Sequence, residues 1–74
     1  MDEKVFYQKL GVRIKYLREK AGLTQEKLAE ILDVSPNYIG RIERGQHNPS
    51  LEKIAKIAYA LNVEVFQLFI ERND

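Results

Sequence analysis

The chain has 74 residues, is 45% hydrophobic, contains no cysteine and carries a formal net charge of +1. This length predicts one domain over residues 1–74, without space for a separate catalytic or effector domain. The composition excludes disulfides and thiolate metal sites, and no run of about 18 apolar residues is present to span a membrane. The start MDEKVFYQKL has mixed charge and lacks the apolar core of a signal peptide, so a cytoplasmic protein is expected.

The first predicted element is a helix over residues 2–21. Its apolar residues recur at spacings of three and four, which places them on one stripe. This stripe is formed by Phe6, Leu10, Ile14, Leu17 and Ala21. Gly22 is expected to end the helix, because glycine takes a left-handed cap without steric penalty. Lys9, Arg13 and Lys15 are expected in solvent, within reach of a phosphate.

Two short helices joined by a tight turn are predicted in the stretch TQEKLAEILDVSPNYIGRIER, residues 24–44. Thr24 and Ser35 are the expected N-caps, and Pro36 takes the first position of the second helix, where its missing N–H is not needed. The inward faces are expected to carry Leu28, Ala29, Ile31, Leu32, Ile39 and Ile42. This arrangement predicts a helix-turn-helix, whose second helix enters the major groove of double-stranded DNA.

A fourth helix and an apolar C-terminal helix are predicted after the motif. Ser50 is the expected N-cap of the fourth helix and Asn62 its left-handed stop. The fourth helix is expected to lie largely in the core through Leu51, Ile54, Ala55, Ile57, Ala58 and Leu61. A fifth helix over residues 64–71 has too many apolar residues for one face, which predicts a second face for a partner copy. The residues expected in this homodimer interface are Val65, Phe66, Phe69 and Ile70.

These elements predict an all-α fold, a five-helix bundle with a central helix-turn-helix. The run TQEKLAEILDVSPNYIGRIERGQHNPSLEKIAKIAYALNV resembles the helix-turn-helix domain of the Cro and lambda-repressor type, also called the xenobiotic-response-element group. The matching features are T-Q, L-A, S-x-x-Y-I, I-E-R-G and N-P-S-L. The size and the apolar tail also resemble restriction–modification controller proteins. The resemblance covers most of the chain and implies DNA binding, but no particular operator.

Base contacts are expected on the exposed side of the second helix of the motif. Asn37 can bond an adenine edge, Arg41 can bond guanine O6 and N7 together, and Pro36 offers only an apolar contact. Phosphate contacts, which fix register and not sequence, are expected from Gln25, Ser35, Tyr38, Arg44, His47 and Asn48. The alternative for Asn37 and Arg41 is plain solvated surface, and Tyr38 can also pack its ring on a neighbouring helix.

The resemblance further implies that Arg18 pairs with Glu43, the glutamate of I-E-R-G. A lone carboxylate on a DNA-facing helix would repel phosphates, so a partly buried ion pair would neutralise Glu43 and join the first helix to the third. The alternative is that Arg18 contacts DNA directly.

Two functions are open at this point. The first is a sequence-specific transcriptional regulator that binds double-stranded DNA as a homodimer on a palindromic operator. The second is a protein-interaction or antitoxin-like module, which the low net charge of +1 favours slightly. An enzyme is not expected, because the sequence has no nucleophile–base pair, glycine-rich phosphate loop or metal-ligand spacing. No cofactor, metal or small-molecule effector is expected either.

Overall fold

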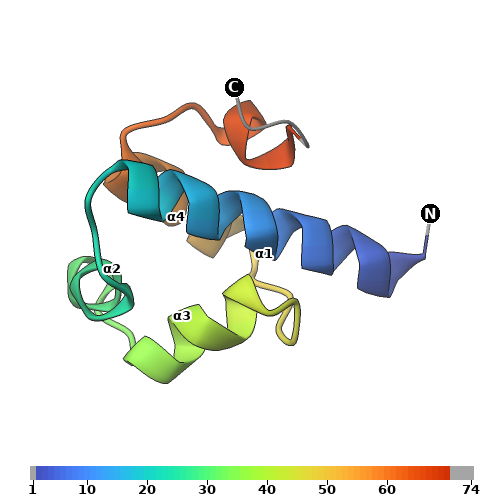
Figure 1. Ribbon diagram of the computed structural model, residues 1–74, viewed down its shortest axis with the longest axis horizontal. Helices are drawn as coiled ribbons and strands as arrows, with labels where there is room; N and C mark the ends of the chain where they lie inside the picture. Colours follow the sequence, from blue (N-terminus) through green and yellow to red (C-terminus); the bar gives the residue numbers. More distant parts are fainter. Residues whose placement is uncertain (1, 71–74) are drawn as a thin grey trace.

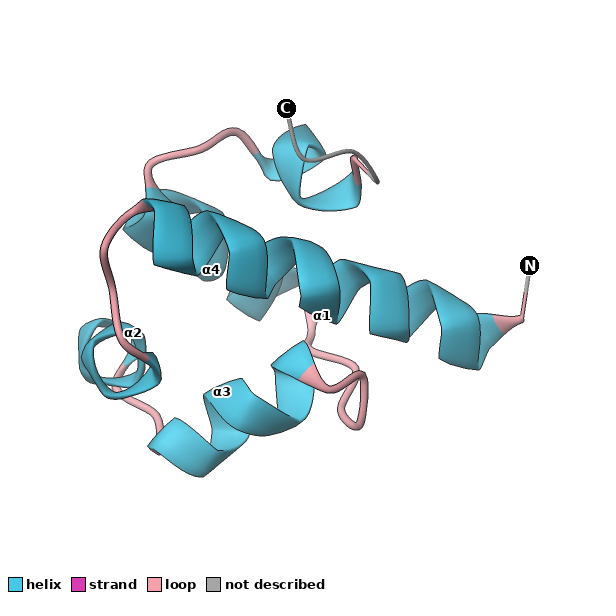
Figure 2. Ribbon diagram, viewed as in Figure 1, coloured by secondary structure: helices cyan, strands magenta, loops and turns pink. Residues whose placement is uncertain are grey.

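Four α-helices and one short 3-10 helix make up residues 2–70, the part of the chain that the computed structural model describes. Among these residues there is no strand (Figure 2). The predicted all-α class is therefore confirmed. In chain order the elements are α1 (Glu3–Lys20), α2 (Gln25–Leu32), α3 (Pro36–Glu43), α4 (Leu51–Leu61) and the 3-10 helix η1 (Val65–Phe69).

The ends of the helices follow the local sequence. The hydroxyl oxygens of Thr24, Ser35 and Ser50 each accept a hydrogen bond from the backbone N–H three residues further on, at 3.0, 3.1 and 3.2 Å. Gly22, with φ of 77°, follows α1, and Asn62, with φ of 59°, ends α4. These caps satisfy backbone groups that a helix leaves unpaired at its ends, so the predicted boundaries of α2, α3 and α4 are confirmed.

The backbones of α1 and α3 meet almost without a gap. A β-carbon on Gly11 would lie 2.5 Å from the carbonyl oxygen of Glu43 and closer still to that of Ile42. At the end of α3, Gly45 has φ of 75°, and a β-carbon there would lie 2.8 Å from Cα of Gln8. Only glycine fits these two positions, so the backbone of α1 fixes the orientation of α3 (Figure 1).

The core gathers side chains from all five elements. Its buried hydrophobic residues are Leu10, Ile14, Leu17, Leu28, Ala29, Leu32, Ile39, Ile42, Ile54, Ile57, Ala58, Leu61 and Leu68. Phe6 and Ala21, expected on the buried stripe of the first helix, are exposed and lie at its two ends. The core therefore uses only the central part of the predicted stripe.

Three further residues predicted to be buried, Ile31, Leu51 and Ala55, are exposed, so the prediction was wrong for them. Ile31 lies on the outer side of α2. Leu51 and Ala55 lie on a side of α4 that neither α2 nor η1 covers. The side of α4 that does face the core carries Ile54, Ile57, Ala58 and Leu61. Apolar residues at helical spacing identify a helix, but they do not say which of its sides is covered.

The predicted fifth α-helix over residues 64–71 is also wrong within the described residues. The chain forms a 3-10 helix, η1, over Val65–Phe69 instead, and residue 71 lies outside the described part. The side chain of Gln67 accepts from the backbone N–H of Glu64 at 2.7 Å, which closes a single tight turn. Arg13 Nε donates to the carbonyl oxygen of Gln67 at 2.8 Å. In an α-helix that oxygen would bond the N–H four residues on, so the contact from α1 favours the short turn.

Arg13 also corrects the expectation that it lies in solvent. Its side chain is almost fully buried, with the guanidinium 5.4 Å from the centre of the Tyr16 ring. Together with its bond to Gln67, this contact packs η1 on the side of α1 that faces away from α3 (Figure 1).

Candidate nucleic-acid interface

The outer side of α3 is free of cover by the described chain. The side chains of Ile39 and Ile42 point into the core, while Pro36, Asn37 and Arg41 are exposed. The helix starts immediately after a turn in which Asp33 adopts φ of 58°, and it packs on α2 and α1 through its inner side. Helix α3 runs along one edge of the fold (Figure 1), and the residues expected to read bases lie on its exposed side.

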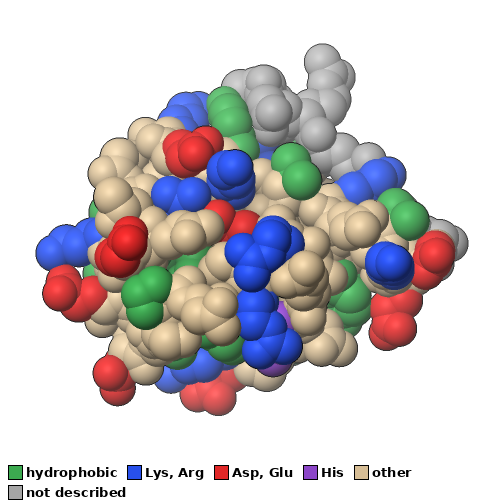
Figure 3. All heavy atoms as spheres, turned by 60° about the horizontal axis from the view of Figure 1, so that its bottom comes forward, with side chains coloured by type: hydrophobic (Ala, Val, Ile, Leu, Met, Phe, Trp, Pro, Cys, Tyr) green, Lys and Arg blue, Asp and Glu red, His purple; other side chains and the backbone are tan. Residues whose placement is uncertain are grey.

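The charge on this face is distributed unevenly, although the net charge of the chain is only +1. Figure 3 turns the side of α3 toward the viewer and shows Lys and Arg side chains gathered in its middle, beside the single histidine. Most of the acidic side chains in this view lie toward the edges. Such a centre is electrostatically suited to an anion, and the local arrangement outweighs the small net charge.

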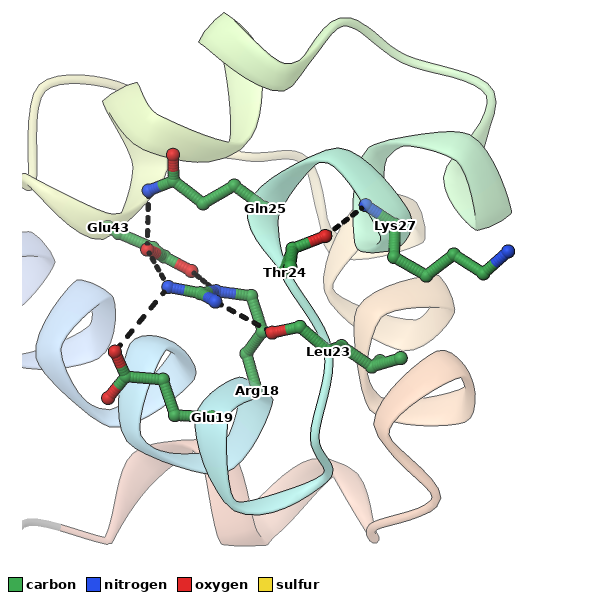
Figure 4. Close-up of polar contacts among 7 residues, drawn as sticks. All are labelled: Arg18, Glu19, Leu23, Thr24, Gln25, Lys27 and Glu43. Carbon is green, nitrogen blue, oxygen red and sulfur yellow. Dashed lines mark hydrogen bonds and ion pairs between the residues drawn. The ribbon is translucent and has the colours of Figure 1, made fainter.

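Glu43 would be the exception, but its charge is neutralised inside the protein. Its two carboxylate oxygens accept from Arg18, at 2.6 Å from Nε and 3.1 Å from Nη2, in a bidentate pair (Figure 4). Both side chains are buried, and Arg18 Nη1 also donates to the backbone oxygen of Leu23 at 2.8 Å. The hydrogen bond to Glu43 raises the pKa of Arg18 above its ordinary value. The pair joins α1 to α3 through charge-assisted hydrogen bonds.

Gln25, at the start of α2, is a third member of this group. Its Nε2 donates to Oε1 of Glu43 at 2.9 Å, a contact that was not predicted from the sequence (Figure 4). A primary amide has two N–H groups, so one N–H and the amide oxygen of Gln25 are left for another partner. The bond to Glu43 holds the side chain at the N-terminus of α2, where helix ends favour anions.

Tyr38 and the loop after α3 form the other part of the surface. The Tyr38 ring is half-buried and meets the His47 ring edge to face, with centroids 4.9 Å apart. Burial raises the pKa of the Tyr38 hydroxyl, so it is a neutral donor at physiological pH. Arg44 Nε donates to the side chain of Gln46 at 3.1 Å, and its guanidinium lies over Gly40. Each of these side chains has a packed or hydrogen-bonded position.

Two further residues that were predicted to contact phosphates, Ser35 and Asn48, lie outside this packed group. The Ser35 hydroxyl accepts from the backbone N–H of Tyr38 as the cap of α3, and Asn48 is exposed in the loop that follows. Among residues 2–70, no group of three or more His, Cys, Asp or Glu side chains is arranged to hold a metal ion. No helix in that part of the chain is long and apolar enough to cross a membrane.

Comparison with known proteins gives a consistent match. The family model described as Helix-turn-helix (HTH_3) matches residues 14–68. The immunity repressor protein of Bacillus phage phi105 is 43% identical over 56 residues, which are 76% of this chain but only 39% of the repressor. An uncharacterized HTH-type transcriptional regulator of Archaeoglobus fulgidus is 43% identical over 61 residues, covering 82% of this chain and 87% of that protein.

A solved structure agrees in both fold and sequence. The crystal structure of the restriction-modification controller protein C.AhdI from Aeromonas hydrophila superposes with a TM-score of 0.82 and 44% identity. The superposition covers 85% of this chain and 96% of that one.

Proposed function

Because the chain belongs to the helix-turn-helix family of the Cro and lambda-repressor type, we propose that it is a sequence-specific transcriptional regulator. It binds double-stranded DNA as a homodimer on a palindromic operator, with one α3 in each of two successive major grooves about 34 Å apart. The observation that carries this proposal is the uncovered outer side of α3, with Asn37 and Arg41 exposed on it.

Base recognition is assigned to Asn37 and Arg41. They are four residues apart on α3, so they lie on the same side of the helix, one turn from each other. An asparagine amide matches the adenine edge and a guanidinium matches guanine O6 and N7. Pro36, in the first turn, is assigned an apolar contact such as a thymine methyl.

Phosphate binding is assigned to side chains at both ends of the motif. Gln25 has one N–H left after bonding Glu43, and Tyr38 has a neutral hydroxyl that can donate. Ser35, Arg44, His47 and Asn48 complete the set that positions α3 in the groove. Neutralisation of Glu43 by Arg18 supports this assignment, because it removes the carboxylate that would repel the DNA backbone.

The contact between the two copies of the homodimer is assigned to apolar residues near the C-terminal end of the described chain. Val65, Phe66 and Phe69 are exposed to different extents, and Phe69 stacks on Phe6 with ring centroids 6.1 Å apart. With Ile70 these residues form an apolar surface, the tail cluster, which a partner copy would cover.

Selection of bound duplexes from a random pool, followed by fluorescence anisotropy, tests the proposal. The selected site should be palindromic and should bind at least 10³-fold more tightly than a scrambled duplex of the same composition. Affinity for both duplexes should fall as salt rises, because counterions are released from the phosphates. A folded protein that prefers no duplex at low salt would contradict the assigned function.

A further inference from the structure

Helix α4 has two apolar sides, and only one of them is used inside the described chain. Leu51, Ala55 and Tyr59 follow each other at spacings of four, which places them in one row on the outside of the helix. We call this row the α4 stripe. Leu51, at 79%, and Tyr59, at 88%, are the most exposed of the large hydrophobic residues within residues 2–70. A single exposed apolar residue is ordinary, but an aligned row beside further apolar surface is typical of an interface.

The tail cluster is too small to hold two copies together by itself. A stable specific interface takes about 800 Å² from each partner, and an aromatic side chain supplies about 150–250 Å² when wholly covered. At 65% and 44% exposure, Phe66 and Phe69 together offer only about 200 Å². Tyr59 at 88% exposure nearly doubles that area, and Leu51 adds to it. The homodimer therefore needs surface beyond the tail cluster.

The α4 stripe adjoins the tail cluster directly. Ala55, Tyr59 and Val65 line one hollow of about 400 Å³ between α4 and η1. On its other side, Ala55 and Tyr59 border a second hollow of about 470 Å³ with Ile31 of α2. The hollow toward α2 is mainly apolar, whereas Asn62, Glu64 and Gln67 also line the hollow toward η1. Apolar surface thus continues from the stripe to α2, and Val65 adjoins it on the η1 side.

The order of residues in the stripe suits a copy of itself. The small residue, Ala55, stands in the middle, and the large ones, Leu51 and Tyr59, stand one turn to either side. If two α4 helices cross in antiparallel orientation on a twofold axis at Ala55, Leu51 of each copy meets Tyr59 of the other. The small central residue lets the helices approach closely, and each Tyr59 packs on the partner's exposed Leu51. An isologous contact of this kind satisfies both copies with the same residues.

The charges next to the stripe also permit this contact. Glu52 and Lys56 form an ion pair within α4 at 3.5 Å, so the edge of the stripe carries one charge of each sign. Along this edge an identical surface meets one charge of each sign, while Asp33 and Glu64 border the two flanking hollows.

We propose that the α4 stripe is the centre of the homodimer interface, with the tail cluster at its edge, and that its occupant is the α4 stripe of a second copy. This inference rests on the homodimer of the proposed function and specifies how that dimer is held. Ile31 and Val65 extend the covered surface to either side.

Cysteine cross-linking tests the twofold axis, because the chain has no cysteine of its own. Ala55→Cys should form a disulfide-linked dimer on mild oxidation, since residues on the axis bring their Cα atoms within disulfide range. Lys53→Cys is the matched control on the same helix. Residue 53 lies on the opposite side from residue 55, so this variant should stay uncross-linked. Equal cross-linking of the two variants would overturn the proposed axis.

Sedimentation velocity tests the stripe without cysteine. Tyr59→Lys and Leu51→Lys should each raise the dimer dissociation constant at least tenfold, while far-UV circular dichroism stays unchanged because both positions are exposed. Glu30→Lys, an exposed position on α2, should leave the constant unchanged. If both stripe variants dimerise like the wild type, the stripe is not the interface, but the proposed function as a dimeric regulator is still supported. If the wild type is monomeric both free and on its selected DNA, the homodimer and the stripe fall together.

Discussion

The close crossing of α1 and α3 predicts opposite outcomes for two glycine-to-alanine substitutions in helices. In Gly11→Ala, the new methyl group meets backbone oxygens of Glu43 and Ile42, which cannot swing aside. The two backbones would have to part by about 1 Å to reach ordinary contact distance. Such overpacking costs about 1–3 kcal/mol or more, while alanine returns up to about 1 kcal/mol of helix propensity. We expect a net loss of about 2 kcal/mol.

Gly40→Ala is the matched control. It is also a buried helical glycine, but the atoms within reach of its β-carbon belong to the guanidinium of Arg44, with Nη1 at 2.9 Å. That flexible side chain can move outward, so helix propensity decides whether the free energy of unfolding rises or falls. Gly40→Ala should leave it unchanged or raise it by up to about 1 kcal/mol.

Urea denaturation followed by circular dichroism measures both changes at 25 °C. A loss of 2 kcal/mol in a domain of this size should also lower Tm by about 10 °C. If Gly11→Ala were as stable as Gly40→Ala, α1 and α3 would not be in backbone contact, and the account of how α3 is oriented would be wrong. A further readout is specific DNA affinity at a temperature where Gly11→Ala is still folded. That affinity should fall, because the position of α3 has changed.

Three other single substitutions, one of them with a double variant as its control, test the site and the interface. Arg41→Ala should relax preference at one base pair of each half-site by about 1–3 kcal/mol, whereas equal weakening on all duplexes would identify a phosphate contact. Arg18→Ala should destabilise the fold by about 3–5 kcal/mol, since the Glu43 carboxylate would stay buried without its partner. Replacing both residues by leucine should recover most of that loss in the same urea experiment, and a double variant no better than Arg18→Ala would count against the charge argument. Phe69→Lys should weaken the dimer with helical content retained, and a mutant that still dimerises at low concentration would remove the tail cluster from the interface.

Features that depend on a few neighbouring residues were predictable from the sequence. Thr24, Ser35 and Ser50 cap helices because a hydroxyl reaches a backbone N–H only three residues away. Gly22 and Asn62 stop helices through their own backbone conformation. The helix-turn-helix is recognisable for the same reason, because its caps, turn and apolar spacing involve residues close in the sequence. The spacing also predicts that Asn37 and Arg41 lie on the outer side of α3, without any knowledge of the other helices.

Features that depend on which elements meet were not predictable. Arg13 is a long polar residue with nothing in its neighbourhood to mark it as buried, and its partner is the backbone of Gln67, 54 residues away. Gly11 lies inside a helix, where the sequence gives no sign that another backbone crosses it. The two sides of α4 are similarly apolar by pattern, so only the packed structure tells the inner row from the outer row. In the candidate site, Gln25 was expected at DNA, but its bond to Glu43 depends on how α2 and α3 meet.

The carboxylate of Glu43 accepts hydrogen bonds from two other helices, from Arg18 of α1 and from Gln25 of α2. The two helices that carry the proposed DNA surface, α2 and α3, are thereby joined to each other and to α1 from the inside, without help from the outer residues of α3. Asn37 and Arg41 are consequently free to vary while the architecture is preserved. Under the proposed base readout, changes at those two positions alone would select a new operator, and relatives with the same skeleton would then control different genes.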